Sequence, residues 1–422
     1  MTETKKKVFV IADHPYAPSG VGTQTKYVIE TLLQTGKYQV IAFGGAVKHQ
    51  DYNPQKTKEW GDDLVIFPVD GYGTQETVRS LIWTQKPDVL WFMTDPRFYV
   101  WLWDMENEIR SVIPMIYYHV WDNFPLPKFN RNFYLSNDMI VTISKVTDEI
   151  VRGVSPEVET RYLPHAVDTE IFKPLDESAI DAVRERHFGK DHKGKTIFFW
   201  NNRNARRKMS GSLIWWFKQF VDKVGRDNVK LLLHTDPKDP NGQDLEVIIN
   251  ETGLADGTVM LSKDKVPPQD LAVMYNAVDC TINISDAEGF GLATLESLSC
   301  GTPIIVNMTG GLQEQVKDEE GNYFGYAIEP ASRAVIGSQE VPYIYEDRVS
   351  EEEFVHALIM VYTMGRENRK KLGLEGRQHV LKNYNFETFK KDWLEVFEHV
   401  IDKHGSWDTR KNYQTWELRE IA

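Results

Sequence analysis

Short apolar runs alternate with amphipathic stretches along this chain in two separate series. The runs of the first series lie at 8–12, 39–43, 64–69, 88–93, 115–119 and 139–143, and those of the second at 196–200, 229–234, 258–261, 279–284, 303–306 and 326–328. An alternation of strands and helices requires right-handed crossovers, which build a parallel sheet with helices on both faces. The pattern therefore predicts an α/β fold of two doubly wound, Rossmann-like domains that face a central cleft.

The segment between the two series lacks a strand-like run, so the domain boundary is expected there. We predict an N-terminal domain at 1–170, a linker at 171–190, a C-terminal domain at 191–385, and C-terminal helices at 386–422 that cross back to the first domain. With 422 residues, 41% of them hydrophobic, the chain can fill two cores. The apolar residues of the last segment recur at the spacing of an amphipathic helix: Phe389, Trp393, Val396, Phe397, Val400 and Ile401.

Charge and cysteine content exclude several classes of protein. The chain carries 49 Lys and Arg against 62 Asp and Glu, a net charge of −13, which argues against a broad nucleic-acid surface but allows a local basic site. Cys280 and Cys300 are too few for a disulfide framework or a zinc cluster, so we expect buried, inert thiols. No apolar run reaches membrane-spanning or signal-peptide length, which predicts a soluble, cytoplasmic protein and leaves peripheral membrane contact open.

The segment from Asp286 to Glu296 reads Asp-Ala-Glu-Gly-Phe-Gly-Leu-Ala-Thr-Leu-Glu and joins a strand-like run to a helical pattern. A helix N-terminus leaves backbone amides unpaired, and its dipole favours an anion such as a diphosphate. Glu288 ends the strand and Glu296 lies about two turns into the helix, so one carboxylate can meet a sugar hydroxyl and the other a ribose. Taken alone, both could equally be ordinary helix carboxylates. The predicted donor contacts of this turn are Gly289, Phe290, Gly291 and Leu292.

A second turn, directly after the strand-like run 196–200, concentrates positive charge in Arg203, Arg206, Arg207 and Lys208. Arginine can grip a phosphate with two donors and lysine acts as a point charge, which suits a departing nucleotide diphosphate. The carboxyl end of a strand is also where open α/β sheets bind ligands. We predict Arg203 and Lys208 as the catalytic pair and Arg207 as a donor contact, with a solvated charged turn as the alternative.

The N-terminal half offers weaker candidates. Gly20 and Gly22 follow the first strand, before a helix expected from Thr23, and would let the backbone approach a phosphate or sugar, or form a plain turn. His119 ends the fifth strand-like run, although a lone histidine is more often structural. The acceptor candidates are Asp95, Trp121 and Asp122.

The sequence lacks the motifs of several common classes of enzyme. The sequence contains no Asp-x-Asp pair for a metal bound to nucleotide phosphates, no Walker loop, no nucleophile elbow and no His-Glu-x-x-His helix. We therefore expect no metal and no cofactor beyond a nucleotide-sugar co-substrate, with positive side chains and helix amides in place of the metal.

In combination, these residues resemble the Glu-x7-Glu retaining glycosyltransferases of the GT-B fold, known as glycosyltransferase family 4. The resemblance rests on the Gly-rich loop after the first strand, His119, the segment 163–174, Arg203 with Lys208, and the block at 288–303. The chain departs from the family in two places. His-Ala at 165–166 replaces the usual Asn-Gly, and the two cations stand one residue closer than expected, so Arg207 can substitute for either.

The resemblance implies a nucleotide-sugar donor held by the C-terminal domain. Glu296 would bind the ribose, Glu288 and the following amides the sugar, and Arg203 and Lys208 the diphosphate. His119 would lie by the reacting sugar, with the acceptor on the N-terminal domain. It further implies metal-independent retention of configuration, with the leaving phosphate accepting the proton. UDP-glucose is the donor expected from family frequency, whereas the linkage, the pathway and the oligomeric state stay open.

The acceptor is equally open: a glycan, a lipid-linked sugar, a small molecule or a modified DNA base. The last needs a basic groove, and a membrane-bound lipid needs an interfacial patch. A sugar-nucleotide-binding protein without turnover remains an alternative. A nicotinamide-dependent dehydrogenase would explain the two glycines but neither the Glu pair nor the basic turn. One stretch supplies the candidates for either the groove or the patch: Lys128, Phe129, Arg131, Phe133, Tyr134 and Lys145.

Overall fold

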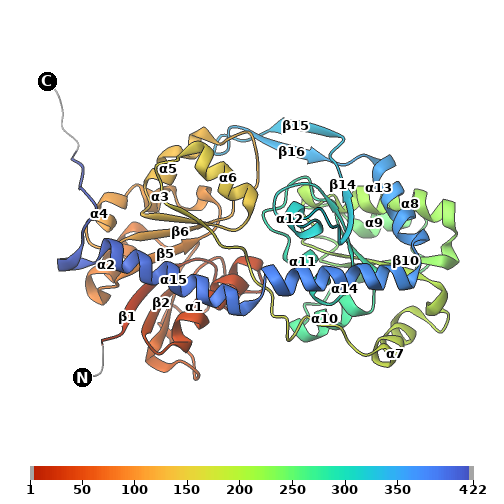
Figure 1. The fold of residues 1–422 in the computed structure, drawn as a ribbon, viewed down its shortest axis with the longest axis horizontal. Helices are drawn as coiled ribbons and strands as arrows, with labels where there is room; N and C mark the ends of the chain where they lie inside the picture. The colour runs from red at the N-terminus through yellow and green to blue at the C-terminus, as the bar shows by residue number, and fades with distance from the viewer. Residues whose placement is uncertain (1–3, 418–422) are drawn as a thin grey trace. The chain divides into compact units, whose positions relative to one another are not determined.

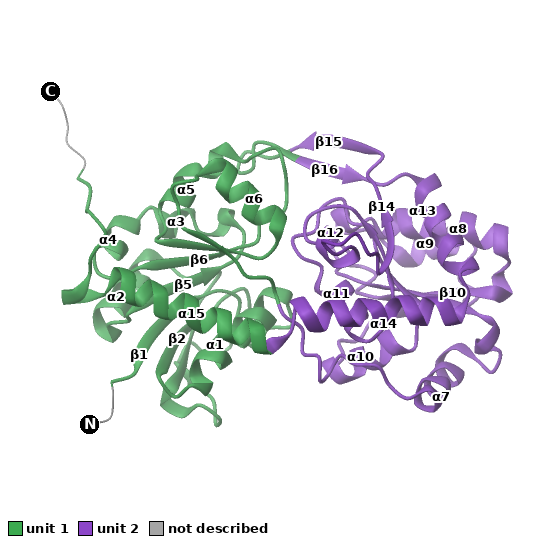
Figure 2. Ribbon diagram, in the orientation of Figure 1, with its two compact units in different colours: residues 1–165, 337–344, 387–422 green, residues 166–336, 345–386 purple. Residues whose placement is uncertain are grey.

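The computed structural model of the chain describes residues 4–417 and divides into two compact units (Figure 2). Unit 1 consists of residues 1–165, 337–344 and 387–422, and unit 2 of residues 166–336 and 345–386. The chain therefore changes unit several times rather than once.

Unit 1 contains an 8-stranded sheet in the order β3-β4-β2-β1-β5-β6-β7-β8, parallel throughout except for the pair β3 and β4. The order reverses direction between β1 and β5, which is the mark of a doubly wound sheet. Its strands are β1 (Lys6–Ile11), β2 (Tyr38–Gly44), β3 (Gln55–Lys56), β4 (Leu64–Pro68), β5 (Val89–Met93), β6 (Met115–His119), β7 (Met139–Thr142) and β8 (Thr160–Tyr162).

The helices of unit 1 cover this sheet, and the predicted C-terminal amphipathic helix is among them. Each of its six predicted apolar residues is buried, and the Trp393 ring packs edge-on against Trp91 and Tyr118 at centroid distances of 5.8 and 4.8 Å. The helices are α1 (Gly20–Gln34), α2 (Gln75–Gln85), α3 (Val100–Trp103), α4 (Glu106–Arg110), α5 (Arg131–Leu135), α6 (Lys145–Val154) and α15 (Phe386–His404).

Unit 2 contains a 6-stranded, all-parallel sheet in the order β11-β10-β9-β12-β13-β14. Here the order reverses between β9 and β12. Both units thus have the predicted doubly wound α/β architecture. The strands are β9 (Thr196–Asn201), β10 (Val229–His234), β11 (Val259–Ser262), β12 (Cys280–Asn283), β13 (Ile304–Asn307) and β14 (Gly325–Ile328).

Helices lie on both faces of this sheet, with α8, α9 and α13 on one face and α10, α11 and α14 on the other (Figure 1). Such two-sided cover is what near-continuous apolar strands require. The bounds are α7 (Glu177–Phe188), α8 (Ser210–Val224), α9 (Leu245–Glu251), α10 (Pro268–Asn276), α11 (Leu292–Ser299), α12 (Leu312–Val316), α13 (Glu351–Thr363) and α14 (Arg366–Asn383).

The stretch 171–190, expected as a linker, lies inside unit 2 and contains α7. It is tied there by hydrogen bonds from Ser299 Oγ to Phe172 O (2.5 Å) and from Leu175 N to Asn276 Oδ1 (2.8 Å). A two-stranded sheet of β15 (Ser332–Ile336) and β16 (Ile344–Arg348) was not expected either. Residues 337–344, which are the connection between its strands and the first residue of β16, belong to unit 1.

Cys280 and Cys300 are buried free thiols, as predicted, and burial raises the pKa of both far above the usual range. Within residues 4–417, no helix is long and apolar enough to cross a membrane.

Candidate active site

Two turns meet where the strand order of unit 2 reverses. The basic turn (residues 203–208) follows β9, and the glycine turn (residues 286–291) follows β12, its neighbour in the sheet. A backbone hydrogen bond from Asp286 N to Arg207 O (2.8 Å) joins the two turns. In open α/β sheets, ligands bind in the crevice outside the carboxyl ends of the strands at such a reversal.

The glycine turn leads into α11, which begins at Leu292 as predicted. Gly291 has a φ of +89°, a conformation that favours glycine. The turn is backed by Gly311, whose N–H donates to Glu288 O (3.2 Å); a Cβ on Gly311 would lie 2.7 Å from Phe290 Cα. The backbone at the start of α11 is therefore held rigidly.

Glu288 is a buried carboxylate paired with a buried lysine. Its Oε2 accepts hydrogen bonds from Lys208 Nζ and from Asn283 Nδ2, the latter at 3.1 Å. Burial alone would raise the pKa of Glu288, but the charges of Lys208 and Arg207 outweigh it and hold the pKa at about 2. Glu288 is thus ionised at neutral pH and acts as a hydrogen-bond acceptor.

Glu296 lies in a different environment, on α11. Burial raises its pKa to about 7, opposed only by a hydrogen bond from Tyr275 Oη to Glu296 Oε2 (2.8 Å). Asn201 Nδ2, at the end of β9, in turn donates to Tyr275 Oη (2.8 Å). This chain of hydrogen bonds fixes the direction of the Glu296 carboxyl group.

Arg207 and Lys208 both reach the glycine turn. Arg207 Nη1 donates to Ala287 O, and Lys208 forms the ion pair with Glu288. Lys208 is 7% exposed, so its charge acts in a poorly hydrated setting, where Coulomb interactions are strong.

The other two cations of the basic turn face different partners. Arg203 donates to both oxygens of Asp239, at 2.6 and 3.2 Å, and Arg206 forms a similar double contact with Glu346. Both side chains are 64% exposed. Of the predicted pair, the structure therefore brings Lys208 to the glycine turn, with Arg207 rather than Arg203 beside it.

Asp286 is a further buried carboxyl group at this turn. Burial and the nearby charge of Glu346 raise its pKa to about 6. Among the described residues its Oδ1 has no hydrogen-bond partner.

Gly20 and Gly22 do not precede the helix as expected, because α1 begins at Gly20 with Ser19 as its N-cap. The hydroxyl of Ser19 accepts from Gly22 N and donates to Asp13. A Cβ on Gly22 would lie 2.8 Å from the carbonyl oxygens of His14 and Ala17. The close approach that requires Gly22 is therefore made by the chain's own backbone.

His119 ends β6 and is fully buried. Its Nε2 lies 2.8 Å from Tyr134 Oη, and its Nδ1 has no hydrogen-bond partner among the described residues. Burial lowers its pKa to about 3, so the imidazole is neutral. The Nδ1 atom of the neutral ring can therefore make one further hydrogen bond, as donor or acceptor according to the tautomer.

Two acceptor candidates already have structural contacts. Asp95 caps a 3-10 turn by accepting from Arg97 N (3.0 Å) and also pairs with the Arg97 guanidinium. Trp121 is 5% exposed and its Nε1 donates to Asn123 O (2.8 Å). Asp122 is half-buried.

In the stretch considered as a basic groove or membrane patch, one aromatic residue is buried and the other two, Phe129 and Phe133, are partly buried by packing. Tyr134 is fully buried and holds His119, while Phe133 stacks on Trp103 at 4.8 Å between ring centroids. Arg131 pairs with Glu157.

Sequence reasoning missed Tyr275, Asn283 and Gly311. Asn283 carries a usable signal, since an amide side chain in a buried strand needs a partner. Tyr275 lies in an ordinary amphipathic stretch and carries none. Within residues 4–417, no three His, Cys, Asp or Glu side chains are grouped so that they could hold a metal ion.

Two doubly wound units, the second with this pair of turns, define a GT-B-like glycosyltransferase fold. Sucrose-phosphate synthase from Thermosynechococcus elongatus has the same fold, with a TM-score of 0.73 at 17% identity over 94% of this chain and 100% of that one. The Anabaena protein HepE, in complex with UDP and glucose, gives a TM-score of 0.66 at 14% identity over 93% and 99%.

Sequence similarity agrees with this fold. Residues 184–379 match the model of the Glycosyl transferases group 1 family. D-inositol 3-phosphate glycosyltransferase of Acidothermus cellulolyticus is 28% identical over 187 residues, which is 43% of this chain and 40% of that protein. The match thus spans less than half of the relative's length.

Proposed function

We propose that this protein is a retaining glycosyltransferase that moves a hexose from a nucleotide-diphosphate sugar to an acceptor hydroxyl. One observation carries the proposal: the buried Glu288–Lys208 pair, with Arg207 beside it, at the amino end of α11. A carboxylate that accepts hydrogen bonds can bind the hydroxyl groups of a sugar. Two cations and a helix N-terminus can bind the diphosphate linked to that sugar.

Each group has a proposed role. Lys208, Arg207 and the first amides of α11 bind the diphosphate and stabilise the charge that grows as it departs. Arg203 joins them when it leaves Asp239. The Glu288 carboxylate accepts a hydrogen bond from a hydroxyl of the transferred sugar, and Glu296 accepts hydrogen bonds from the ribose hydroxyls.

The proton of the acceptor hydroxyl goes to the leaving phosphate, on the same face of the sugar, so that configuration is retained. Two features support this route. Glu288, with a pKa near 2, is too weak a base for the task. The two cations beside it supply the positive charge that a metal would otherwise bring to the diphosphate, which supports metal-independent transfer.

UDP-glucose is the first donor to test, because HepE is described in complex with UDP-glucose and its fold matches this chain at a TM-score of 0.64. D-inositol 3-phosphate is the first acceptor to test, since curated relatives similar to this chain are named for it. His119, with its unpartnered Nδ1, is proposed to lie by the reacting sugar.

The test is a calorimetric titration with UDP, GDP and ADP, followed by product analysis with the matching sugars. Glu288→Gln should abolish transfer and slow hydrolysis of the donor. Glu375→Gln, which changes an exposed carboxylate of α14, is the matched control and should leave both unchanged. A protein that binds the nucleotide sugar but neither hydrolyses nor transfers it is a binding protein. Failure to bind any of the nucleotides contradicts the whole proposal.

A further inference from the structure

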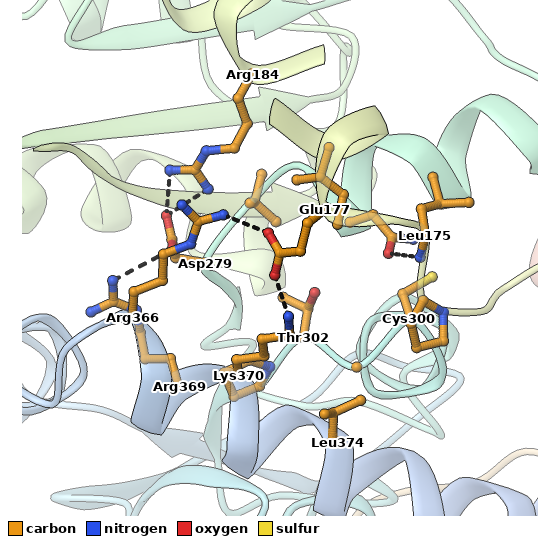
Figure 3. Close-up of a pocket in the computed structure, with 16 residues that line it drawn as sticks. Leu175, Glu177, Arg184, Asp279, Cys300, Thr302, Arg366, Arg369, Lys370 and Leu374 are labelled. Atoms are coloured by element: carbon orange, nitrogen blue, oxygen red, sulfur yellow. Dashed lines mark hydrogen bonds and ion pairs between the residues drawn. The ribbon is translucent and has the colours of Figure 1, made fainter. Parts of the chain in front are cut away.

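Unit 2 contains a cavity of about 80 Å³ lined by α7, the turn after α11 and the first turns of α14 (Figure 3). A water molecule needs about 15 Å³ of such space. The cavity therefore has room for about five water-sized groups, which is the size of a phosphate group. None of the sequence-predicted site residues lines it.

The charged residues of the lining are Arg184, Arg366, Arg369, Lys370, Glu177 and Asp279. Four basic groups against two acidic groups leave a local excess of positive charge in a chain whose net charge is −13. Three of the basic residues also occupy the first turns of α14, where the helix dipole disfavours cations. An anion in the cavity would be attracted by the side chains and the helix alike.

The inner wall of the cavity, formed by Arg184, Arg369 and Asp279, contains buried donors that have no partner within residues 4–417. Asp279 accepts hydrogen bonds from Arg184 (3.0 Å) and Arg369 (3.4 Å), so the two guanidinium groups are fixed. Arg184 and Arg369 are only 2% and 6% exposed, yet the Nε atom of each has no hydrogen-bond partner among the described residues. Buried N–H donors are rarely left without an acceptor.

The outer wall already binds a carboxylate. Arg366 Nη2 contacts Glu177 Oε2 at 3.1 Å, and Lys370 Nζ pairs with Glu177 Oε1 (Figure 3). The side chain of Glu177 is 53% exposed, so it can turn to solvent and leave both cations to another anion. Asp181, 3.6 Å from Arg366, is itself paired with Lys193 at 3.0 Å.

We propose that this cavity binds a phosphate group, either inorganic phosphate or the phosphate of a small monoester. Arg366 and Lys370 hold the phosphate oxygens, Arg184 and Arg369 add positive charge to the same lining, and Glu177 is displaced to solvent. The site is separate from the glycine turn, and the proposal does not depend on the proposed transferase activity.

The test is a calorimetric titration of the full chain with inorganic phosphate and with glycerol 3-phosphate at constant ionic strength. Saturating UDP is present, so that phosphate does not report on the glycine turn. Lys370→Gln should weaken phosphate binding by about fivefold, because one charge at about 4 Å in water contributes roughly that factor. Glu177→Gln should strengthen it by about the same factor, because it removes the competing carboxylate.

Glu375→Gln is the matched control, since it neutralises an exposed carboxylate on the same helix outside the cavity, and it should leave the affinity unchanged. Tighter binding of glycerol 3-phosphate than of phosphate identifies a monoester as the ligand, and the reverse identifies the free ion. The proposal is overturned if neither phosphate nor glycerol 3-phosphate binds in the millimolar range. It is also overturned if the lysine and glutamate variants shift the affinity in the same direction or not at all.

Discussion

Tyr275→Phe should raise the pH at which nucleotide binding reaches half of its maximum. The pKa of Glu296 is about 7 because burial raises it while the Tyr275 hydroxyl opposes the rise. Removing the hydroxyl leaves burial unopposed, so the pKa rises further. Cys300, close by, stays a neutral thiol, because burial raises its pKa far above neutral pH. Since a carboxylate is a stronger acceptor of ribose hydroxyls than a carboxylic acid, binding should strengthen as pH rises through the pKa of Glu296.

The size of the effect follows from the hydrogen bond that is lost. A hydrogen bond to a charged group contributes about 1.5–3 kcal/mol, and about 1.4 kcal/mol corresponds to a tenfold change in proton affinity. The midpoint should therefore move from about 7 in the native protein to between about 8 and 9 in Tyr275→Phe. Glu296→Gln should remove this pH dependence and weaken binding by about tenfold or more.

The assay is calorimetric titration of nucleotide between pH 5.5 and 9. The terminal phosphate of UDP ionises near pH 6, at about the second pKa of a phosphomonoester, so uridine serves as the phosphate-free ligand. Tyr118→Phe removes a buried hydroxyl in unit 1, bonded to Leu163 O at 2.9 Å, and should not move the midpoint. An unchanged or lower midpoint in Tyr275→Phe would refute the reasoning.

The raised pKa of Glu296 also affects the stability of the protein when no ligand is bound. Because the folded-state pKa of Glu296 lies above its usual 4.5, the folded state binds the proton more tightly than the unfolded state between about pH 4.5 and 7. Stability should therefore fall by about 3 kcal/mol as pH rises through that window. Relative to Glu296→Gln, urea unfolding of the native protein should show this loss, whether or not the protein binds nucleotides.

Three further changes test the site. Lys208→Met leaves the buried Glu288 charge without its partner and should lower the free energy of unfolding in urea by about 3–5 kcal/mol. A second change, Glu288→Leu, should restore most of this loss. Since the pKa of Glu288 is lowered to about 2, the stabilisation by the native pair should be lost as pH falls from about 4.5 towards 2. Gly311→Ala places a Cβ 2.7 Å from the backbone of the glycine turn and should weaken UDP binding by about tenfold. Arg207→Gln should reduce UDP affinity more than Arg203→Gln, measured by calorimetry, because Arg207 already reaches that turn; an equal loss would contradict this ranking.

The hydropathy pattern predicted the buried sheets well and the exposed elements poorly. The runs 115–119 and 229–234 coincide residue for residue with β6 and β10, because buried parallel strands must be continuously apolar. By contrast, β8 and β15 lie at edges, β8 half-buried and β15 largely exposed, so their sequences carry no apolar run. The helix α7 was missed for a similar reason: it is polar, and it is held by contacts with residues about 100 positions away, such as Arg184 with Asp279.

At the candidate site, local features were predictable and partner choice was not. The start of α11 follows from Gly291 and the helical spacing after it, both of which are local. The distribution of the four cations depends on carboxylates distant in sequence, Asp239 for Arg203 and Glu346 for Arg206. Which cation faces the glycine turn is therefore a property of the tertiary structure.

The opposite pKa shifts of the two carboxyl groups on α11 and its preceding turn bear on how the site works. Burial acts on both, but the charges of Lys208 and Arg207 outweigh it at Glu288, whereas only a hydroxyl opposes it at Glu296. An acid–base pair would need one group poised to donate a proton to the reacting atoms. Glu288 is held as an anion, and Glu296 lies beside Tyr275, away from the cations of the basic turn that would face a departing diphosphate. The pair is therefore suited to holding two hydroxyl-bearing parts of one ligand, with only the Glu296 end responsive to pH near neutrality.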